Sequence, residues 1–331
     1  MTQAPYLDAY LAPLKTWLER PNVTDILVNR PGEVWVETTQ GVMTREAAPD
    51  LTEVVLGRLA RQIAAASHQG VSRESPLLSA TLADGARIQV IAPPATRDGL
   101  VLAVRRQAIA DLSLQDLGQA GLFSTVETAT KKAGRDAQLQ GLLDAHQHED
   151  FLRAAVKARK SIVISGGAGA GKTTLLNALL KEISTDERLI AIEDAPEIRL
   201  HHDNALGLVA VRGDQGEARV TTDDLLAASL RMRPDRIILG ELRGAEAFSF
   251  LRAVNSGHPG SLTTVHADST TGALDQIALL ALSSGLDLGW THLQTYVRRI
   301  VDVVVQVEKS AAGRRVSEIT FNLNGHVSGP S

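Results

Sequence analysis

A glycine-rich segment in the middle of the chain has the residue types and spacing needed to hold a phosphate group. Residues 166–174 read GGAGAGKTT and match the pattern G-x-x-x-x-G-K-[ST] at Gly166, Gly171, Lys172 and Thr173. The apolar run SIVIS precedes the segment, and the helix-forming run TLLNALLKEI follows its glycines. In a strand, glycine turn and helix placed in this order, successive backbone N–H groups point at one anion and the helix N-terminus adds partial positive charge. The segment therefore predicts a P-loop that binds the phosphates of a nucleotide.

The residues of this loop have separate expected parts in binding ATP and Mg²⁺. We expect Lys172 to reach the β- and γ-phosphates and the Thr173 hydroxyl to ligate Mg²⁺. The nucleotide-binding residues that the motif predicts are Gly167, Ala168, Gly169, Ala170, Gly171, Lys172, Thr173 and Thr174.

Carboxylates stand at the ends of two strand-like runs in the same half of the chain. Glu241 ends the run RIILGE, where P-loop ATPases place a ligand to Mg²⁺-bound water or a base for the attacking water. The segment IEDAPE places Glu193, Asp194 and Glu197 at the end of another run. On the residues alone, this second cluster fits a solvated turn as well as a site. The loop together with Glu241 predicts an enzyme that hydrolyses ATP.

Other charged residues of this half give weaker signals. Its histidines show no pair at metal-ligand spacing on a helix, and a lone histidine is most often structural. Arg243, two residues after Glu241, fits an exposed surface charge equally well.

Composition limits the classes of protein to which the chain can belong. With 34 basic and 38 acidic residues the formal charge is −4, which gives no general attraction to nucleic acid or anionic lipid. The chain has no cysteine, so a disulfide framework and a cysteine-based zinc module are excluded. No apolar run approaches the roughly 20 residues that span a bilayer, and the N-terminus MTQAPYLDAY does not resemble a signal peptide. We expect a soluble protein whose membrane role depends on partners.

The candidate site residues need a scaffold, and the second half of the chain provides the pattern for one. The runs SIVIS, RLIAIED, LGLVAV and RIILGE, with SLTTVH as a weaker candidate, alternate with helices expected at 172–183, 222–232 and 244–256. This alternation predicts a parallel sheet with helices on its faces. The runs VDVVVQVE and RVSEITFN flank Gly313 and predict an antiparallel hairpin near the end.

The first half of the chain has a different pattern. Leucines recur at helical spacing from Leu7 onward, with a break expected at Pro13. Two hairpins, VTDILVN with VWVET and TLADGARIQVIA, and the strand LVLAVRR are separated by a helix for which Asp50 and Glu53 resemble a capping box. The chain therefore divides into an N-terminal α+β domain (1–106), a polar linker with short helices (107–149) and a P-loop ATPase domain (150–331).

Longer segments resemble one family of motors. The stretch SLRMRPDRIILGELRGAEAFSFLRAVNSGHPGSLTTVHADS is similar to the signature of the type II/type IV secretion ATPases, with IEDAPE as their acidic box and TVHADS as their histidine box. VTDILVNRPGEVWVE, ESPLLSATLADGARIQV and RKSIVISGGAGAGKTTLLNAL resemble the VirB-type traffic ATPase of type IV secretion and conjugation systems.

This resemblance implies an α/β fold in which a smaller α+β, PAS-like N-terminal domain precedes a RecA-like P-loop ATPase domain. It implies a homo-hexamer of two stacked rings in the cytoplasm, at the mouth of a secretion channel, that powers substrate transfer or channel and pilus assembly. The implied partners are channel components and other secretion ATPases. The implied contact with the inner membrane is peripheral, and no sequence-specific nucleic acid is expected.

The resemblance also assigns catalytic residues. Glu193 and Glu241 match the two catalytic acidic positions of the family. Together with Thr173 they are the expected metal ligands. His266 matches the family's histidine box. Lys172 is the loop lysine.

The resemblance further implies that an arginine from the N-terminal domain reaches the γ-phosphate. Arg105 is the first candidate for this role, because it lies at the end of the last N-terminal strand. Arg106 and Arg87 compete with it.

Three other functions remain as alternatives. A type II secretion or type IV pilus ATPase is the nearest of them, although LVNRPGEVWVE and the absence of cysteine argue against it. A DNA-stimulated RecA-like motor is disfavoured by the net charge and by the small aromatic fraction of 3%. A scaffold that uses ATP only as a switch is the third.

Overall fold

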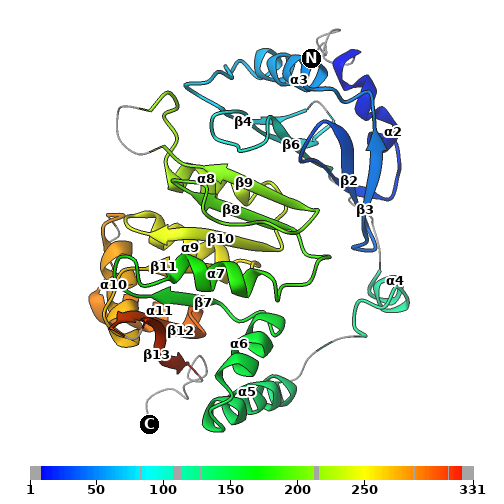
Figure 1. The fold of residues 1–331 in the computed structure, drawn as a ribbon. Helices are drawn as coiled ribbons and strands as arrows, with labels where there is room; N and C mark the ends of the chain where they lie inside the picture. The colour runs from blue at the N-terminus through cyan, green and yellow to red at the C-terminus, as the bar shows by residue number, and fades with distance from the viewer. Residues whose placement is uncertain are drawn as a thin grey trace.

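Two β-sheets, one from each half of the chain, form the frame of the molecule (Figure 1). The computed structural model describes residues 9–322 except 83, 107–112, 125, 127–128, 212–215, 286–287 and 312. Leu7, the first residue of the expected leucine repeat, lies outside this part. The break expected at Pro13 is confirmed, because a short 3₁₀ helix, η1 (Ala12–Leu14), ends where helix α2 (Lys15–Leu18) begins.

The first sheet is antiparallel, and its two faces contribute to different cores. Its strands are β1 (Val23–Val28), β2 (Gly32–Thr38), β3 (Met43–Ala48), β4 (Leu77–Thr81), β5 (Arg87–Ile91) and β6 (Val101–Arg105), in the order β3-β2-β1-β6-β5-β4. Helices α2 and α3 (Glu53–Ala66) pack on one face together with Ile26 and Val28. Leu27, between these two residues, points to the other face and joins the core of the second sheet, since successive strand side chains alternate in direction.

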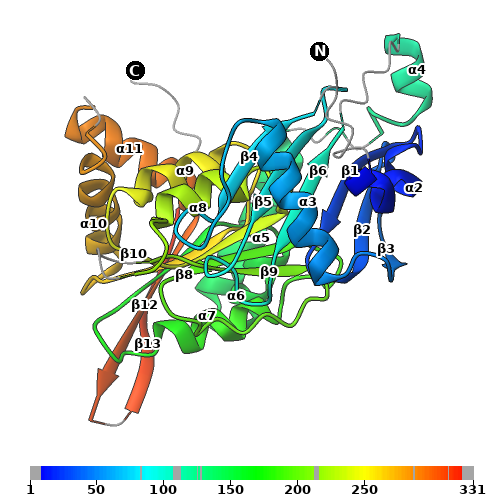
Figure 2. The ribbon, with the colours of Figure 1, turned by 90° about the horizontal axis from the view of Figure 1, so that it is seen from above.

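The second sheet is parallel except for its last strand. Its strands are β7 (Ile162–Ser165), β8 (Leu189–Glu193), β9 (Ala205–Val209), β10 (Arg236–Leu242), β11 (Leu262–Val265), β12 (Val303–Ser310) and β13 (Gly313–Phe321), in the order β13-β12-β7-β11-β10-β8-β9. All five predicted parallel-sheet runs are strands, and the expected final hairpin is β12–β13. Figure 2 shows this hairpin extending beyond the rest of the sheet.

Helices cover both faces of the second sheet. Ile162 and Ile164 of β7 share a core with α6 (His148–Lys157) and α7 (Lys172–Leu180). Val163, between them, shares a core with α8 (Thr222–Ser229), α9 (Glu246–Asn255), α10 (Thr270–Leu282) and α11 (Trp290–Ile300). This is a mixed α/β fold with a RecA-like P-loop sheet preceded by a smaller α+β part. Among the described residues, no helix is both long and apolar enough to cross a membrane.

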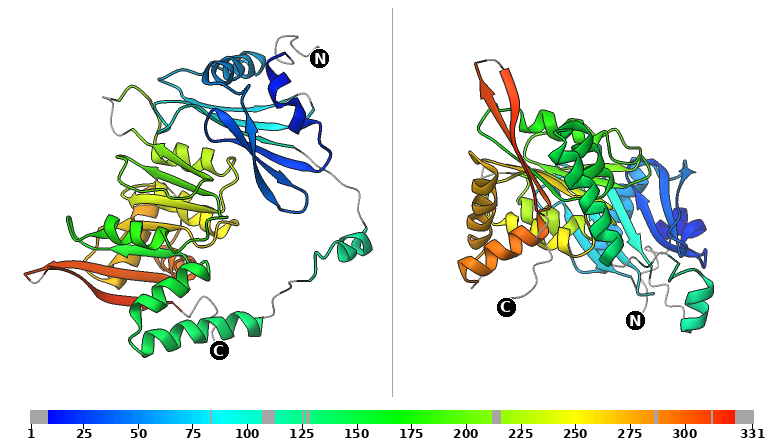
Figure 3. Two further views of the ribbon diagram at one scale, coloured as in Figure 1. Left: turned by 45° about the vertical axis from the view of Figure 1, so that its right-hand side comes forward. Right: turned by 90° about the horizontal axis from the view of Figure 1, so that it is seen from below.

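Two helices that lie between the halves in the sequence are on the outside of the molecule. Figure 3 shows α4 (Leu114–Gln119) standing apart from both sheets, whereas α5 (Ala129–Asp144) packs beside α6. Helix α5 has 16 residues, so the expectation of short helices alone in this polar segment is wrong.

Several local expectations differ from the structure. Helix α3 is capped by Thr52, whose hydroxyl accepts from Val55 N, and not by Asp50. Strand β3 was not predicted, since only half of its residues, MTREAA, are apolar and only Ala48 is buried. Helices α10 and α11 were also not predicted. Helix α8, expected at 222–232, begins with a full capping box formed by Thr221 and Asp224.

Buried polar contacts join the halves close to strand β8. Arg188, directly before β8, is fully buried, and its Nη1 donates to Asn29 Oδ1 of the first half at 2.8 Å. Burial lowers the pKa of Arg188 to about 9. Arg233 pairs with Glu37 of β2. These contacts fix the N-terminal sheet against the strand edge that leads to the candidate site.

Candidate functional site

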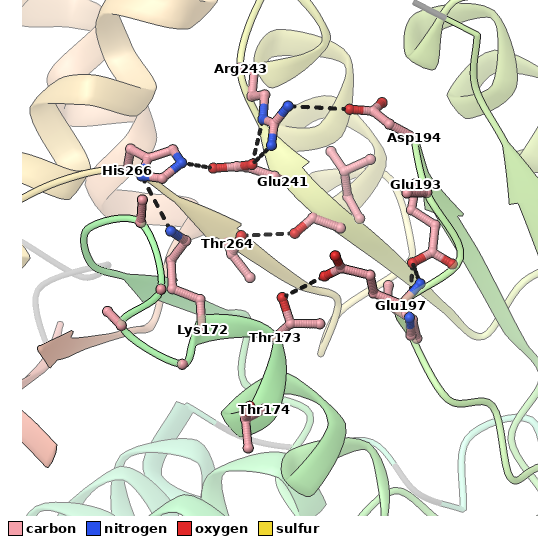
Figure 4. A pocket seen from close by; sticks show the side chains of 18 of the residues that line it. Lys172, Thr173, Thr174, Glu193, Asp194, Glu197, Glu241, Arg243, Thr264 and His266 are labelled. Atoms are coloured by element: carbon pink, nitrogen blue, oxygen red, sulfur yellow. Dashed lines mark hydrogen bonds and ion pairs between the residues drawn. The ribbon is translucent and has the colours of Figure 1, made fainter. Parts of the chain in front are cut away.

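A cavity of about 570 Å³ lies at the carboxyl ends of the parallel strands (Figure 4). Its walls come from the P-loop, the ends of β8, β10 and β11, and the start of β13. They include all eight predicted nucleotide-binding residues together with Glu193, Asp194, Glu197, Glu241, Arg243, Thr264, His266 and Arg314. Ligands of open α/β sheets bind at this end of the strands, so the position fits the sequence prediction.

The backbone of the P-loop needs glycine at its two ends. A Cβ on Gly166 would lie 2.3 Å from Val307 O, so no side chain fits there. Gly171 has a φ of +104°, which L-residues rarely adopt, and it is the residue from which α7 starts. The helix therefore begins at Lys172 with its free N–H groups directed into the loop.

Lys172 is held inside the loop by neutral acceptors. Its Nζ donates to Gly166 O at 2.9 Å and Gly167 O at 3.2 Å, and lies 3.3 Å from His266 Nδ1. Burial lowers the pKa of Lys172, nearby Arg243 acts in the same direction, and Glu241 opposes the shift. The three N–H groups of the ammonium thus all have partners that a phosphate could replace.

His266 links the lysine to Glu241. An ammonium can only donate, so the Nδ1 that faces Lys172 accepts, and the proton of a neutral imidazole must be on Nε2. Nε2 lies 2.7 Å from Glu241 Oε1, at ion-pair distance. Arg243 pairs with the other oxygen of Glu241 and lies 3.5 Å from Asp194 Oδ2. Figure 4 shows these side chains as one continuous row from the P-loop to the acidic cluster.

The acidic cluster after β8 divides into two kinds of carboxylate. Glu193 is only 6% exposed, and its Oε2 accepts from Glu197 N at 2.8 Å and Ile198 N at 2.9 Å. Its Oε1 pairs with Arg97 of the first half. The carboxylate of Glu197 lies instead beside the P-loop, where its Oε2 accepts from Thr173 Oγ1 at 3.2 Å. Glu197 is therefore the acidic side chain that directly contacts the Thr173 hydroxyl.

The residues present fit a magnesium–nucleotide complex. Within the described ranges, no three His, Asp or Glu side chains gather closely enough to hold a metal unaided. Mg²⁺ usually takes one or two protein oxygens and completes its shell with water and substrate phosphates. Thr173 offers a hydroxyl at the helix start, with the Glu197 carboxylate beside it. The predicted metal ligands Glu193 and Glu241 also line the cavity, but their oxygens have protein partners.

The N-terminal arginines lie outside this cavity in the single chain. Arg105 is largely exposed, with its Nε 3.8 Å from Asp25 Oδ1, and it lines a second cavity together with Arg87 and Arg231. Arg106 donates to the backbone oxygens of Arg20 and Val23. A part for Arg105 in catalysis stays a prediction.

Two residues that contact the site were not named from the sequence: Arg314, which lines the cavity, and Arg97, which pairs with Glu193. Neither had a local signal. The sequence had left Glu197 and Arg243 open between a site and a surface position, and both line the cavity. Arg314 comes from β13, and its Nε donates to the P-loop carbonyl of Gly169 at 3.1 Å.

Comparison with known proteins places these features in one family. The family model described as type II/IV secretion system protein matches residues 8–317. The type IV secretion system protein VirB11 of Bartonella quintana is 37% identical over 327 residues, covering 94% of this chain and 92% of the relative. The type IV secretion system protein PtlH of Bordetella pertussis is 39% identical, covering 95% of each. The crystal structure of the VirB11 ATPase of the Brucella suis type IV secretion system in complex with sulphate superposes with a TM-score of 0.88 at 36% identity, covering 96% of this chain and 98% of that one.

Proposed function

The chain belongs to the type II/IV secretion system protein family, and from this we propose that it is the ATP-hydrolysing traffic motor of a type IV secretion system. The observation that carries the proposal is the cavity at the P-loop, where Lys172, Thr173 and two carboxylate clusters meet at the carboxyl edge of the sheet. The similarity to VirB11 proteins over nearly the whole chain supports the same reading.

The arrangement suggests a part for each side chain. The N–H groups at the start of α7 hold the phosphates, and Lys172 exchanges the carbonyls of Gly166 and Gly167 for phosphate oxygens. Thr173, assisted by Glu197, holds Mg²⁺, which when bound supplies positive charge next to the phosphates.

Glu241 is proposed to orient or deprotonate the attacking water. Its two partners, His266 and Arg243, hold its carboxylate in a fixed direction. When Lys172 turns toward a phosphate, His266 Nδ1 loses the hydrogen bond from Lys172. Nucleotide binding can therefore shift His266 and, through it, Glu241.

We propose that six chains form the working motor in the cytoplasm, against the inner face of a secretion channel. The partners would be channel components and related secretion ATPases, and the contact with the inner membrane would be peripheral. A ring also gives Arg105 a route to a nucleotide, since its exposed side chain could face a neighbouring chain.

The proposal is tested by Mg²⁺-dependent release of phosphate from ATP, measured for the wild type and for Lys172→Ala. Loss of the only side chain that the loop places over the phosphates should abolish turnover, whereas ATP binding should weaken less. Lys181→Ala, at the exposed end of the same helix, is the matched control and should keep wild-type turnover.

Light scattering with ATP and Mg²⁺ should give the mass of a hexamer, and single-stranded DNA should not stimulate turnover. Near wild-type hydrolysis by Lys172→Ala would refute the site. A strong response to DNA would indicate a nucleic-acid motor instead.

A further inference from the structure

The first half of the chain reaches the border of the nucleotide cavity through the loop between β5 and β6. Residues 92–100 of this loop run along the edge strand β9: Val209 N donates to Ala95 O at 2.9 Å, and Arg97 N donates to Gly207 O at 3.1 Å. Thr96 and Leu208 form an antiparallel bridge. The loop therefore adds a short strand-like segment to the second sheet on the outer side of β9, and β9 in turn neighbours β8, which ends at Glu193.

Arg97 extends from this segment to the back of the acidic cluster. Its Nη1 donates to Ile198 O at 2.9 Å, and its Nη2 pairs with Glu193 Oε1. The side chains of Arg97 and Glu193 are only 17% and 4% exposed. Water screens such a pair far less than it screens a surface pair, so the interaction is a strong one. Burial lowers the pKa of Arg97, but an arginine guanidinium stays charged at neutral pH.

Strand β9 leaves room for this arginine. An ideal Cβ on Gly207 would lie 2.4 Å from Cδ and 2.5 Å from Nε of Arg97, so any side chain at 207 would displace the guanidinium. Gly207 is not among the glycines with a positive φ, so the backbone itself does not require glycine here. Glycine is needed at this position because a side chain would collide with Arg97.

With Arg97 in place, both carboxylate oxygens of Glu193 have a partner. One carboxylate oxygen is held by the backbone N–H groups of Glu197 and Ile198, and the other by Arg97. Without Arg97 a buried carboxylate oxygen would lack its cationic partner, which is strongly unfavourable. The Glu193 carboxylate would then turn toward water, and the segment that carries Glu197 would lose its anchor.

We propose that Arg97 is a positioning residue through which the N-terminal half holds Glu193 and, with it, the 193–198 segment at the nucleotide cavity. The same residue binds the segment from the other side through Ile198 O. The position of Glu197 beside Thr173 therefore depends on whether the β5–β6 loop is docked on β9. Movement of the N-terminal half away from β9 would release the acidic cluster. This inference rests on the proposed function for its effect on ATP turnover, whereas the pairing itself does not depend on turnover.

The test compares Arg97→Ala, Arg97→Lys, Glu193→Gln and the double variant Arg97→Ala/Glu193→Gln. A misplacement of about 1 Å at a catalytic group can cost about 10²-fold, so we expect kcat of Arg97→Ala to fall about 10- to 100-fold with little change in KM for ATP. Arg97→Lys keeps the charge and should recover part of kcat. The double variant should have nearly the kcat of Glu193→Gln alone, because both changes act on one group.

Arg73 provides the matched control. It forms another ion pair between the halves, with Glu217, but this pair is exposed and remote from the cavity residues. Arg73→Met removes an ion pair that also joins the two halves but is exposed, and it should leave kcat within about twofold of wild type. An equal loss in Arg73→Met and Arg97→Ala would show that only general docking matters, and would overturn the proposal.

A steric test keeps both charges. Gly207→Ala should displace Arg97 and lower kcat in the wild-type background, but in the Arg97→Ala background it should have no further effect, since the clashing atoms are gone. Independent effects of the two changes, or full activity of Arg97→Ala, would overturn the inference.

Thermal unfolding separates this inference from the proposed function. If the wild type hydrolyses no ATP, the proposed function fails, and the pairing is judged from stability alone. The Arg97→Ala/Glu193→Gln protein should then unfold at a higher temperature than Arg97→Ala. Arg97→Ala leaves the buried Glu193 charge without a partner, and the second substitution removes that charge. Additive losses of stability would refute the pairing.

Discussion

Glu241 offers the most direct test of how the row of side chains between Lys172 and Asp194 works. The change Glu241→Gln keeps the shape of the side chain but removes its charge. One of its two partners, His266 Nε2 at 2.7 Å or the Arg243 guanidinium, must then face an NH₂ group and not an oxygen. A hydrogen bond to a charged group contributes about 1.5–3 kcal/mol, and since Arg243 is nearly half exposed we expect a loss of about 1–2 kcal/mol in the free energy of unfolding.

The effect on turnover should be much larger than the effect on stability. Loss of a positioned general base costs about 10²–10⁴ in rate, so kcat for Mg²⁺-ATP should fall by that factor. The affinity for ATP, measured by titration of a fluorescent analogue, should stay within a few-fold, because the P-loop contacts are unchanged.

Glu246→Gln is the control for this experiment. Glu246 lies five residues away and accepts from Arg243 N and Gly244 N, but it does not line the cavity. Its neutralised form should keep kcat near wild type. Equal kcat in wild type and Glu241→Gln, or equal losses in both variants, would refute the assignment of Glu241 to the attacking water.

Three further outcomes are expected. Arg314→Ala should raise the Kd for ATP about three- to tenfold, more at low salt than at high salt, because a cation beside Gly169 is lost; an unchanged Kd in titrations would place Arg314 outside binding. Arg105→Ala should lower kcat about 10³–10⁵-fold while light scattering still reports a hexamer. Full activity of this variant would rule out a catalytic role for Arg105. Burial lowers the pKa of His258, so below about pH 6.5 the unfolded chain binds the proton first and stability falls as pH decreases. The melting temperature of His258→Asn should therefore drop less between pH 7 and pH 5.5 than that of wild type or of the exposed-site control His201→Asn, and parallel curves would contradict this.

The sequence was most informative where one local segment contains all the groups of a feature. The P-loop is such a segment, since the glycines and Lys172 lie within nine residues between a strand and a helix. Most of the buried parallel strands were predictable for the same reason, because they are continuous apolar runs, whereas β11, with Thr263 and Thr264, was a weaker candidate. Helix α10 also had a local signal, as Ser269 caps an Ala- and Leu-rich run, and could have been predicted.

Features that depend on tertiary contacts were not accessible in this way. Arg97 and Arg314 approach the cavity from a loop and a hairpin that are far from the P-loop in sequence. The roles within IEDAPE depend on which backbone N–H groups each carboxylate meets, and spacing does not determine this. Strand β3 was missed because it pairs only with β2 at the edge of the sheet, where few of its residues are buried. Its sequence therefore shows little alternation of apolar and polar residues.

The two faces of the N-terminal sheet have a consequence for how the molecule folds. Leu27, Ile91 and Ala103 belong to the same apolar core as the helices behind the second sheet, so this core cannot form from residues of one half alone. The halves are therefore linked thermodynamically: either half alone exposes apolar surface that the intact chain buries, and heat should melt both in one cooperative transition. Any motion that separates them during a catalytic cycle must be small, or must be compensated by apolar contacts with a neighbouring chain.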